Sequence, residues 1–311
     1  MERFRTGNGR HYLALTAAAA SWGVATVISK QSVDEIPPLA LLPIQLATSL
    51  VLLSILLKVS GRQNSWTRET TRLGLLGFLN PGLSYALGLI GLTQITASLS
   101  VVLWATEPVM ILLLAAWLLR ERISGTMALA IGVATIGVFL AAVETDTSGA
   151  LPGIAFTLAG VAGCAIYTVI TRKWMGDDST LAVLTAQQLC ALIFALGVLG
   201  VFWSSGERVA ISTWSGGAWV SAVVSGILYY ALAFWLYLTG LRRVPAAVAG
   251  LFLNLIPIFG VGTGYLLGER LSSLQSLGSV LIVAAVAAML WLRSRPMPLT
   301  VRVPSIIVDD R

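Results

Sequence analysis

The chain has 311 residues, of which 57% are hydrophobic and 11% are charged. About 25% of the residues of an ordinary soluble domain are charged, so this composition excludes a water-soluble globular protein. The formal net charge is +6, and its meaning depends on where the basic residues lie along the chain.

Apolar runs follow one another along the whole chain, each close to the roughly 20 residues that cross a bilayer as an α-helix. They cover residues 11–31, 38–59, 72–92, 97–119, 123–142, 150–173, 180–203, 216–238, 246–268 and 272–292. The connections between these runs are too short to hold a soluble domain. We therefore expect an all-α polytopic membrane protein with ten transmembrane helices.

Basic residues are distributed unevenly between the two sets of connections. If the N-terminus is cytoplasmic, only Lys30, Arg208 and Arg270 fall on the outer side, and the other 17 of the 20 Lys and Arg residues fall inside. This is the positive-inside bias of a membrane protein. We expect both termini in the cytoplasm and a multi-pass protein of the inner (cytoplasmic) membrane. Because topology accounts for the positive charge, no nucleic-acid partner is expected.

The two halves of the chain resemble each other. A shift of 142 residues lays "TVISK" (26–30) on "TVITR" (168–172). Shifts of 142 or 149 residues also pair residues that hydrophobicity does not require: Gln45 with Gln187, Gly77 with Gly226, and Pro108 with Pro257. These ordered matches predict an internal duplication.

Each copy of the duplication contains five predicted spans, and five is an odd number. The second copy must therefore enter the membrane in the opposite orientation, as in the inverted repeats of secondary transporters. The predicted boundaries are an N-terminal tail at 1–10, a first repeat at 11–142, a connecting loop at 143–149, a second repeat at 150–292 and a C-terminal tail at 293–311.

Short motifs add to this pattern. They are "WG" at 22–23 in the first span, "EP" at 107–108 in the fourth, and "ER" after the fourth and ninth spans, at 121–122 and 269–270. With the two five-helix repeats, they make residues 11–292 resemble the EamA-type branch of the drug/metabolite transporter superfamily, and within it the aromatic amino-acid exporters. The resemblance implies alternating access, a central cavity built from both halves, and export from the cytoplasm.

Glu107 and Pro108 stand out within the fourth run. An ionised carboxylate at mid-bilayer costs roughly 2.5–3.5 kcal/mol on insertion scales, so it should face a wet cavity or find a partner. Pro108 removes a backbone donor and predicts a bend beside it. Glu107 could hold the ammonium group of a substrate or carry a coupling proton. Alternatively, it could bond exposed backbone or a neighbouring helix and never meet a substrate.

Other polar and aromatic side chains inside the spans are candidates for the same pathway. The predicted substrate-binding set is Trp22, Gln45, Asn80, Tyr85, Trp104, Glu107, Tyr167, Gln187 and Asn254, with Pro108 and Pro257 as hinges or bends. The aromatic rings could stack on an apolar body or a cation, and the amides could bind both ends of an amino acid. Packing explains many rings equally well, and hydrogen bonds between helices could account for the amides.

Several classes of function are disfavoured. The sequence has no phosphate-binding G-x-x-x-x-G-K-[ST] motif, so ATP-driven pumping by this chain is excluded. Cys164, Cys190 and His11 are too few for a metal site or a catalytic triad, so we expect no catalytic residues, no metal and no cofactor. Phosphorylated substrates would need basic residues in the cavity, and Lys30 is the only candidate.

The favoured function is secondary export of amino acids, aromatic or large apolar ones preferred, and of related small metabolites. The alternatives are a multidrug exporter for lipophilic cations, a non-transporting membrane scaffold and an intramembrane enzyme. The expected partners are a small zwitterionic or cationic substrate and membrane lipid. We expect the monomer to function alone, with a dimer through the fifth and tenth spans as the alternative.

Overall fold

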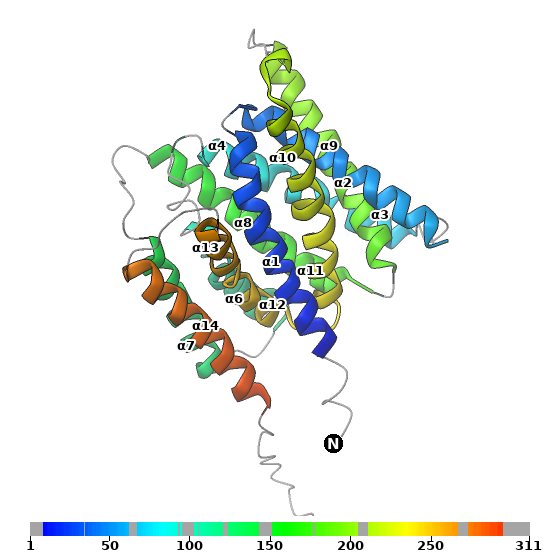
Figure 1. The fold of residues 1–311 in the computed structure, drawn as a ribbon. Coiled ribbons are helices and arrows are strands. Elements are labelled where there is room, and N and C mark those ends of the chain that lie inside the picture. Colours follow the sequence, from blue (N-terminus) through cyan, green and yellow to red (C-terminus); the bar gives the residue numbers. More distant parts are fainter. Residues whose placement is uncertain are drawn as a thin grey trace, which may run out of the picture.

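A computed structural model describes residues 9–33, 35–61, 67–92, 94, 103–104, 106–120, 124–142, 151–176, 178–204, 211–266 and 273–294. All regular structure in these ranges is helical, which confirms the all-α prediction for them (Figure 1). Seven helices are long and apolar enough to cross a membrane, and three further apolar helices among the described residues are shorter. The helix is favoured because a bilayer offers no partner for free backbone groups.

The helices of the first half follow the predicted runs. They are α1 (Gly9–Val33), α2 (Pro38–Val59), α3 (Arg68–Gly74), the π-helix η2 (Phe78–Leu83), α4 (Ser84–Leu92), α6 (Glu107–Leu118) and α7 (Gly125–Ala142). The chain enters α3 through Thr67, whose side chain caps the helix by accepting a hydrogen bond from the Thr70 N–H. The α3, η2 and α4 segments form one rod, which we call the first rod.

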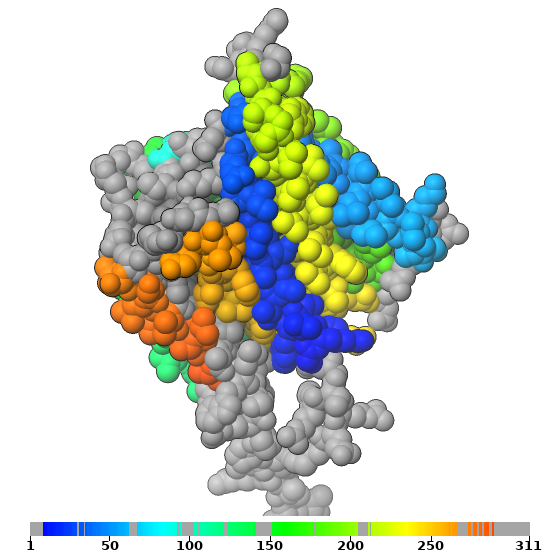
Figure 2. Space-filling view, in the orientation of Figure 1, coloured from blue at the N-terminus to red at the C-terminus, as the bar shows by residue number. Residues whose placement is uncertain are grey.

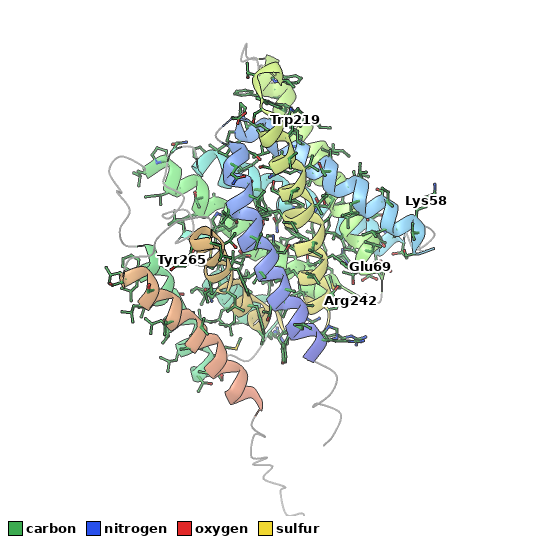
Figure 3. The ribbon with its side chains drawn as sticks, viewed as in Figure 1. Lys58, Glu69, Trp219, Arg242 and Tyr265 are labelled. Atoms are coloured by element: carbon green, nitrogen blue, oxygen red, sulfur yellow. The ribbon has the colours of Figure 1, made fainter. Side chains whose placement is uncertain are left out.

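The second half has a matching series of helices. They are α8 (Leu151–Trp174), α9 (Thr180–Ser204), the 3₁₀ turn η3 (Ile211–Thr213), α10 (Gly216–Gly226), the π-helix η4 (Ile227–Ala233), α11 (Phe234–Leu241), α12 (Ala246–Leu253), α13 (Ile256–Leu266) and α14 (Ser273–Ser294). The α10, η4 and α11 segments form the second rod. Trp219 and Arg242 lie near its two ends (Figure 3).

The two π-helical segments occupy equivalent positions. Phe78 begins η2 and Ile227 begins η4, and these residues are related by the 149-residue shift that also aligns Pro108 with Pro257. Helical geometry is also broken inside η2, where Asn80 is extended with φ −146° and ψ 121°. Helical geometry is therefore interrupted at equivalent positions in the two rods.

The second helix of each half packs against the rod of the other half. Helix α2 packs against the second rod, whereas α9 packs against the first. Two glycines allow these close approaches: a Cβ on Gly77 would meet the Gln187 carbonyl group, and a Cβ on Gly226 would lie 2.7 Å from the Gln45 carbonyl oxygen. The sequence matches of Gly77 with Gly226 and of Gln45 with Gln187 thus correspond to two matching helix crossings.

Helices α7 and α14 lie side by side at the edge of the molecule (Figures 1 and 2). They pack mainly against each other, and α6 and α13 provide their main links to the rest of the bundle. Large apolar side chains on the pair, such as Leu129 and Val280, are exposed. The start of α1 and the end of α14 lie toward the same side of the molecule (Figure 1).

Candidate functional site

Aromatic rings from both halves meet inside the bundle around Phe234, the first residue of α11. Its ring centroid lies 5.3 Å from that of Trp22 on α1, 6.1 Å from Tyr85 on α4, 6.3 Å from Tyr167 on α8 and 6.4 Å from Tyr230 on η4. Most of these pairs have the edge-to-face or tilted geometry that aromatic quadrupoles favour. We call this group, with the rings described next, the aromatic cluster.

Tyr85 extends the cluster toward the fourth predicted span. Its ring centroid lies 5.7 Å from Trp104 and 5.4 Å from Tyr229, and both partners are partly buried. On the other side of the cluster, the Tyr237 ring lies 5.4 Å from Trp22. The predicted residues Trp22, Tyr85, Trp104 and Tyr167 are therefore members of one ring cluster.

Glu107 is the first residue of α6, so it begins a helix instead of lying inside one. The preceding turn is closed by Thr106, whose N–H and hydroxyl both donate to the Leu103 carbonyl. Pro108 is buried in the first helical turn, where its missing N–H removes no intrahelical hydrogen bond. In the structure a helix begins just before Pro108, and the bend expected there stays a prediction.

The Glu107 side chain is partly buried next to the aromatic cluster. Its carboxylate is close enough to interact electrostatically with the hydroxyls of Tyr85, Tyr229 and Tyr237 and with the Cys164 thiol. Among the described residues it has no hydrogen-bond or ion-pair partner. Within the described part of the chain, this carboxylate therefore has no countercharge and lies beside the aromatic cluster.

The ninth predicted span is broken at the matching position. Helix α12 ends at Leu253 and α13 begins at Ile256, which the 149-residue shift aligns with Glu107. Pro257 is buried in the first turn of α13. A helix thus begins one residue before each of the two prolines, and the bend at Pro257 stays a prediction.

Asn254 ends α12 at this break, with an exposed fraction of only 1%. Neither its amide nitrogen nor its amide oxygen has a hydrogen-bond partner among the described residues, and the same is true of the Trp22 indole nitrogen. Trp22 and Asn254 lie on neighbouring segments. The backbones of these segments approach closely, because a Cβ on Gly23, next to Trp22, would lie 2.7 Å from the carbonyl oxygen of Ile256. Leaving a buried polar atom unpaired costs about 1–3 kcal/mol, so such atoms need an explanation.

Gln45 and Gln187 are both buried and both connect helices. The Gln45 amide nitrogen donates to the hydroxyls of Ser29 on α1 (2.9 Å) and Ser225 on α10 (2.8 Å). The Gln187 amide nitrogen donates to the Leu73 carbonyl (3.2 Å), and its oxygen accepts from the Tyr167 hydroxyl at 2.9 Å. Each glutamine therefore ties the first helix of its own half to the rod of the other half.

Other buried polar groups support the two rods. Leu228 and Tyr230 in η4 present carbonyl groups that accept hydrogen bonds from the Ser21 hydroxyl (2.8 Å) and the Gln188 amide nitrogen (3.1 Å). Asn80 in η2 is 3% exposed, and its side-chain oxygen has no partner among the described residues. The predicted site residue Asn80 thus marks the irregular part of the first rod.

Residues that the sequence predictions missed include Phe234 and Gln188. Phe234 contacts rings from four other segments, yet in the sequence it is one aromatic among many in "YYALAFWLY" (229–237). Gln188 follows the repeat-matched Gln187, but it bonds the second rod, that of its own half, and its side-chain oxygen is unpaired among the described residues. The doubled glutamine was the available signal for this second contact.

An acidic residue binds the start of a rod at each end of the bundle. The Glu35 carboxylate accepts hydrogen bonds from the Ser215 N–H (2.7 Å) and hydroxyl (2.8 Å), which hold the pKa of this exposed carboxyl below its usual value. The Asp178 carboxylate accepts from the hydroxyls of Thr67 and Thr70, each at 2.7 Å. Both connections join the loop after the first helix of one half to the rod of the other half.

The family model and the relatives that match this chain are all described as transporters. A model of the EamA-like transporter family matches the chain twice, over residues 10–143 and 151–291. The uncharacterized transporter YetK of Bacillus subtilis (strain 168) is 27% identical over 301 residues, covering 92% of this chain and 88% of that protein. An uncharacterized transporter of Archaeoglobus fulgidus is 23% identical over 280 residues, covering 89% and 97%.

A solved crystal structure shares the fold. It aligns with a TM-score of 0.77 over 93% of this chain and 100% of the other chain, at 17% sequence identity. At this identity the similarity concerns the architecture alone.

Proposed function

Because this chain belongs to the EamA-like transporter family, we propose that it exports amino acids, with aromatic or large apolar side chains preferred, and related small metabolites. The proposal makes Glu107 the anchor of the substrate's ammonium group and the aromatic cluster the wall that contacts its apolar body. One observation carries it: a carboxylate that has no countercharge among the described residues lies beside a cluster of aromatic rings in a multi-pass membrane protein.

The physical basis is the cost of a lone charge in the membrane. A carboxylate at this depth needs water or a cation, and an ammonium group can donate hydrogen bonds to it while pairing the two charges. Rings next to the carboxylate add cation–π attraction and apolar contact. The amide of Asn254 and the indole N–H of Trp22, which have no partner within the described residues, supply donors suited to the substrate carboxylate.

The remaining parts of the proposal concern topology. We infer ten membrane spans in two inverted repeats at 11–142 and 150–292, with cytoplasmic termini in the inner membrane. The two broken helices at Glu107 and at Asn254–Ile256 then lie between the repeats, where discontinuous helices of secondary transporters bind their substrates. Alternating access would move the two rods relative to each other, and a monomer contains all parts of the route.

A lipophilic cation is the second candidate substrate class. The same carboxylate and rings suit a quaternary ammonium or phosphonium ion, which carries no carboxylate of its own. The two candidates differ in their need for the polar atoms of Asn254 and Trp22. An exporter of cations would leave these atoms unused, whereas an amino-acid exporter would use them.

Transport into proteoliposomes separates these possibilities. Uptake of labelled phenylalanine and of labelled tetraphenylphosphonium is measured with and without a proton gradient. The proteins compared are the wild type, Glu107→Gln and the control Glu69→Gln, which changes a carboxylate at one end of the bundle (Figure 3). Charged hydrogen bonds are worth about 1.5–3 kcal/mol, so Glu107→Gln should raise the KM for phenylalanine roughly 10- to 100-fold, and Glu69→Gln should not.

The outcomes distinguish the readings clearly. Flux of tetraphenylphosphonium without flux of any amino acid would replace the amino-acid proposal by the cation exporter. Unchanged phenylalanine KM and unchanged response to the proton gradient in Glu107→Gln would remove Glu107 from the site. Loss of the gradient response with an unchanged KM would assign Glu107 to proton coupling.

A further inference from the structure

An apolar depression lies on the outside of the bundle, between the C-terminal parts of α6 and α8. Its volume is about 240 Å³. The lining side chains, all apolar, are Leu114, Trp117 and Leu118 from α6 and Ile166, Val169 and Ile170 from α8. Trp117 is 78% exposed, so this groove opens to the surroundings of the protein instead of to its interior.

In a membrane protein, the surroundings of such a groove are lipid acyl chains. Its six lining side chains come from the C-terminal parts of two helices that pack against each other. A bulky indole forms one border and branched aliphatic side chains form the other. This shape fits a single hydrocarbon chain lying along the helices.

Basic residues mark the end of the groove. On α8, Ile166, Ile170 and Lys173 fall on one helical stripe, because residues three, four and seven apart share a face. Lys173 is exposed and lies about 10 Å along the helix from Ile166, at a rise of 1.5 Å per residue. The long side chain can reach from the helix end toward a head group.

Arg120 supplies a second cation just beyond α6. The helix ends at Leu118, and Arg120 is exposed with a positive φ of 52°. A residue with this left-handed backbone conformation cannot continue the α-helix, so Arg120 lies directly after the C-terminus of α6. Two exposed cations thus follow the two helices that form the groove.

We propose that this groove binds an anionic phospholipid, with one acyl chain on the apolar lining and the phosphate between Lys173 and Arg120. Two features support this proposal: the apolar lining suits a hydrocarbon chain, and the two basic side chains suit a phosphate. Basic pockets between membrane helices are known to recognise anionic head groups in this way. The proposal does not depend on what the protein transports.

Native mass spectrometry of the protein in detergent tests the site. Phosphatidylglycerol and phosphatidylcholine with identical chains are titrated against the wild type and against a variant carrying both Arg120→Ala and Lys173→Ala. Each basic residue near a membrane surface contributes about 1 kcal/mol toward anionic lipid. The preference for phosphatidylglycerol should therefore fall about 10- to 30-fold in the double variant and remain in the control Lys58→Ala, which removes an exposed lysine near the end of α2.

A second variant tests the chain-binding wall. Ile166→Trp places a large ring in the groove and leaves both cations in place, so it should lower the binding of phosphatidylglycerol, whereas Lys173→Arg should retain it. Free glycerol phosphate, which has no acyl chain, should not compete. Equal binding of the two lipids by the wild type, an equal loss in Lys58→Ala, or displacement by glycerol phosphate would overturn the proposal. Because the two substituted cations are exposed, thermal unfolding in phosphatidylcholine should match the wild type.

Discussion

Replacing Gly77 by alanine tests the packing that joins the two halves. A Cβ at this position would contact the Gln187 carbonyl oxygen and lie 2.6 Å from its carbonyl carbon and 2.7 Å from its Cα. All three atoms belong to the backbone of α9, so no side-chain rotation can relieve the contact. Overpacking of this kind costs typically about 1–3 kcal/mol, and we expect Gly77→Ala at the upper end of that range.

Two matched variants give the expected order of effects. Gly226→Ala makes the equivalent change in the second rod, where the Cβ would lie 2.7 Å from the Gln45 oxygen and 2.8 Å from its Cα, so its cost should be smaller. Gly200→Ala lies on an exposed face of α9 with nothing within 4 Å of the added Cβ. Alanine favours a helix over glycine by about 0.5–1 kcal/mol, so Gly200→Ala should be neutral or stabilising.

Reversible denaturation in mild detergent, followed by circular dichroism, measures these differences. The free energy of unfolding should decrease from Gly200→Ala to Gly226→Ala to Gly77→Ala. If Gly77→Ala unfolds at the same denaturant concentration as Gly200→Ala, then α9 does not approach the first rod this closely. The inferred crossing of the two halves would then be wrong.

Two further predictions concern the polar connections. Gln187→Leu should lower the free energy of unfolding by about 1–3 kcal/mol, because it leaves the buried Leu73 carbonyl and Tyr167 hydroxyl without their partner, whereas Tyr167→Phe should cost only about 1 kcal/mol. Glu35→Gln should remove a pH-dependent contribution to stability, because hydrogen bonds from Ser215 lower the pKa of Glu35 in the folded protein. This contribution is present above the unfolded pKa of about 4.3 and is lost as the pH falls through the folded pKa. The difference in Tm between the wild type and Glu35→Gln should therefore shrink as the pH is lowered from about 6 to about 3, and a constant difference would contradict this.

The sequence predicted the helical class correctly, and it singled out Pro108 and Pro257, beside which helices begin in the structure. Apolar run length marks a membrane helix almost regardless of neighbours. Pro108 and Pro257 lack the N–H that a continuous helix needs, so they predicted disturbances at two related places. The structure goes further, because Glu107 and Ile256 each begin a new helix. A proline pattern alone does not distinguish a bend from a helix start.

The contacts of individual side chains were harder to predict. The hydrogen-bond partners of Gln45 and Gln187 belong to helices that are remote in the sequence, and nothing in either half specifies that its second helix packs against the rod of the other half. Pro81 and Gly82 signal an irregular helix at η2, but the matching segment η4, "ILYYALA", contains neither proline nor glycine, so its π-helical turn could not be predicted from composition. Ring packing around Phe234 likewise depends on the meeting of five segments, which no single-helix pattern contains.

The two breaks are equivalent in position but not in chemistry. The first presents the carboxylate of Glu107, whereas the aligned residue of the second is the apolar Ile256, and a neutral amide, Asn254, occurs just before it. A site with the same group on both sides would accept a substrate in either direction. A charge on one side and an amide on the other can instead distinguish the two ends of a ligand such as an amino acid. Under the proposed function, this asymmetry gives a physical reason to expect one preferred substrate orientation in a chain built from two similar halves.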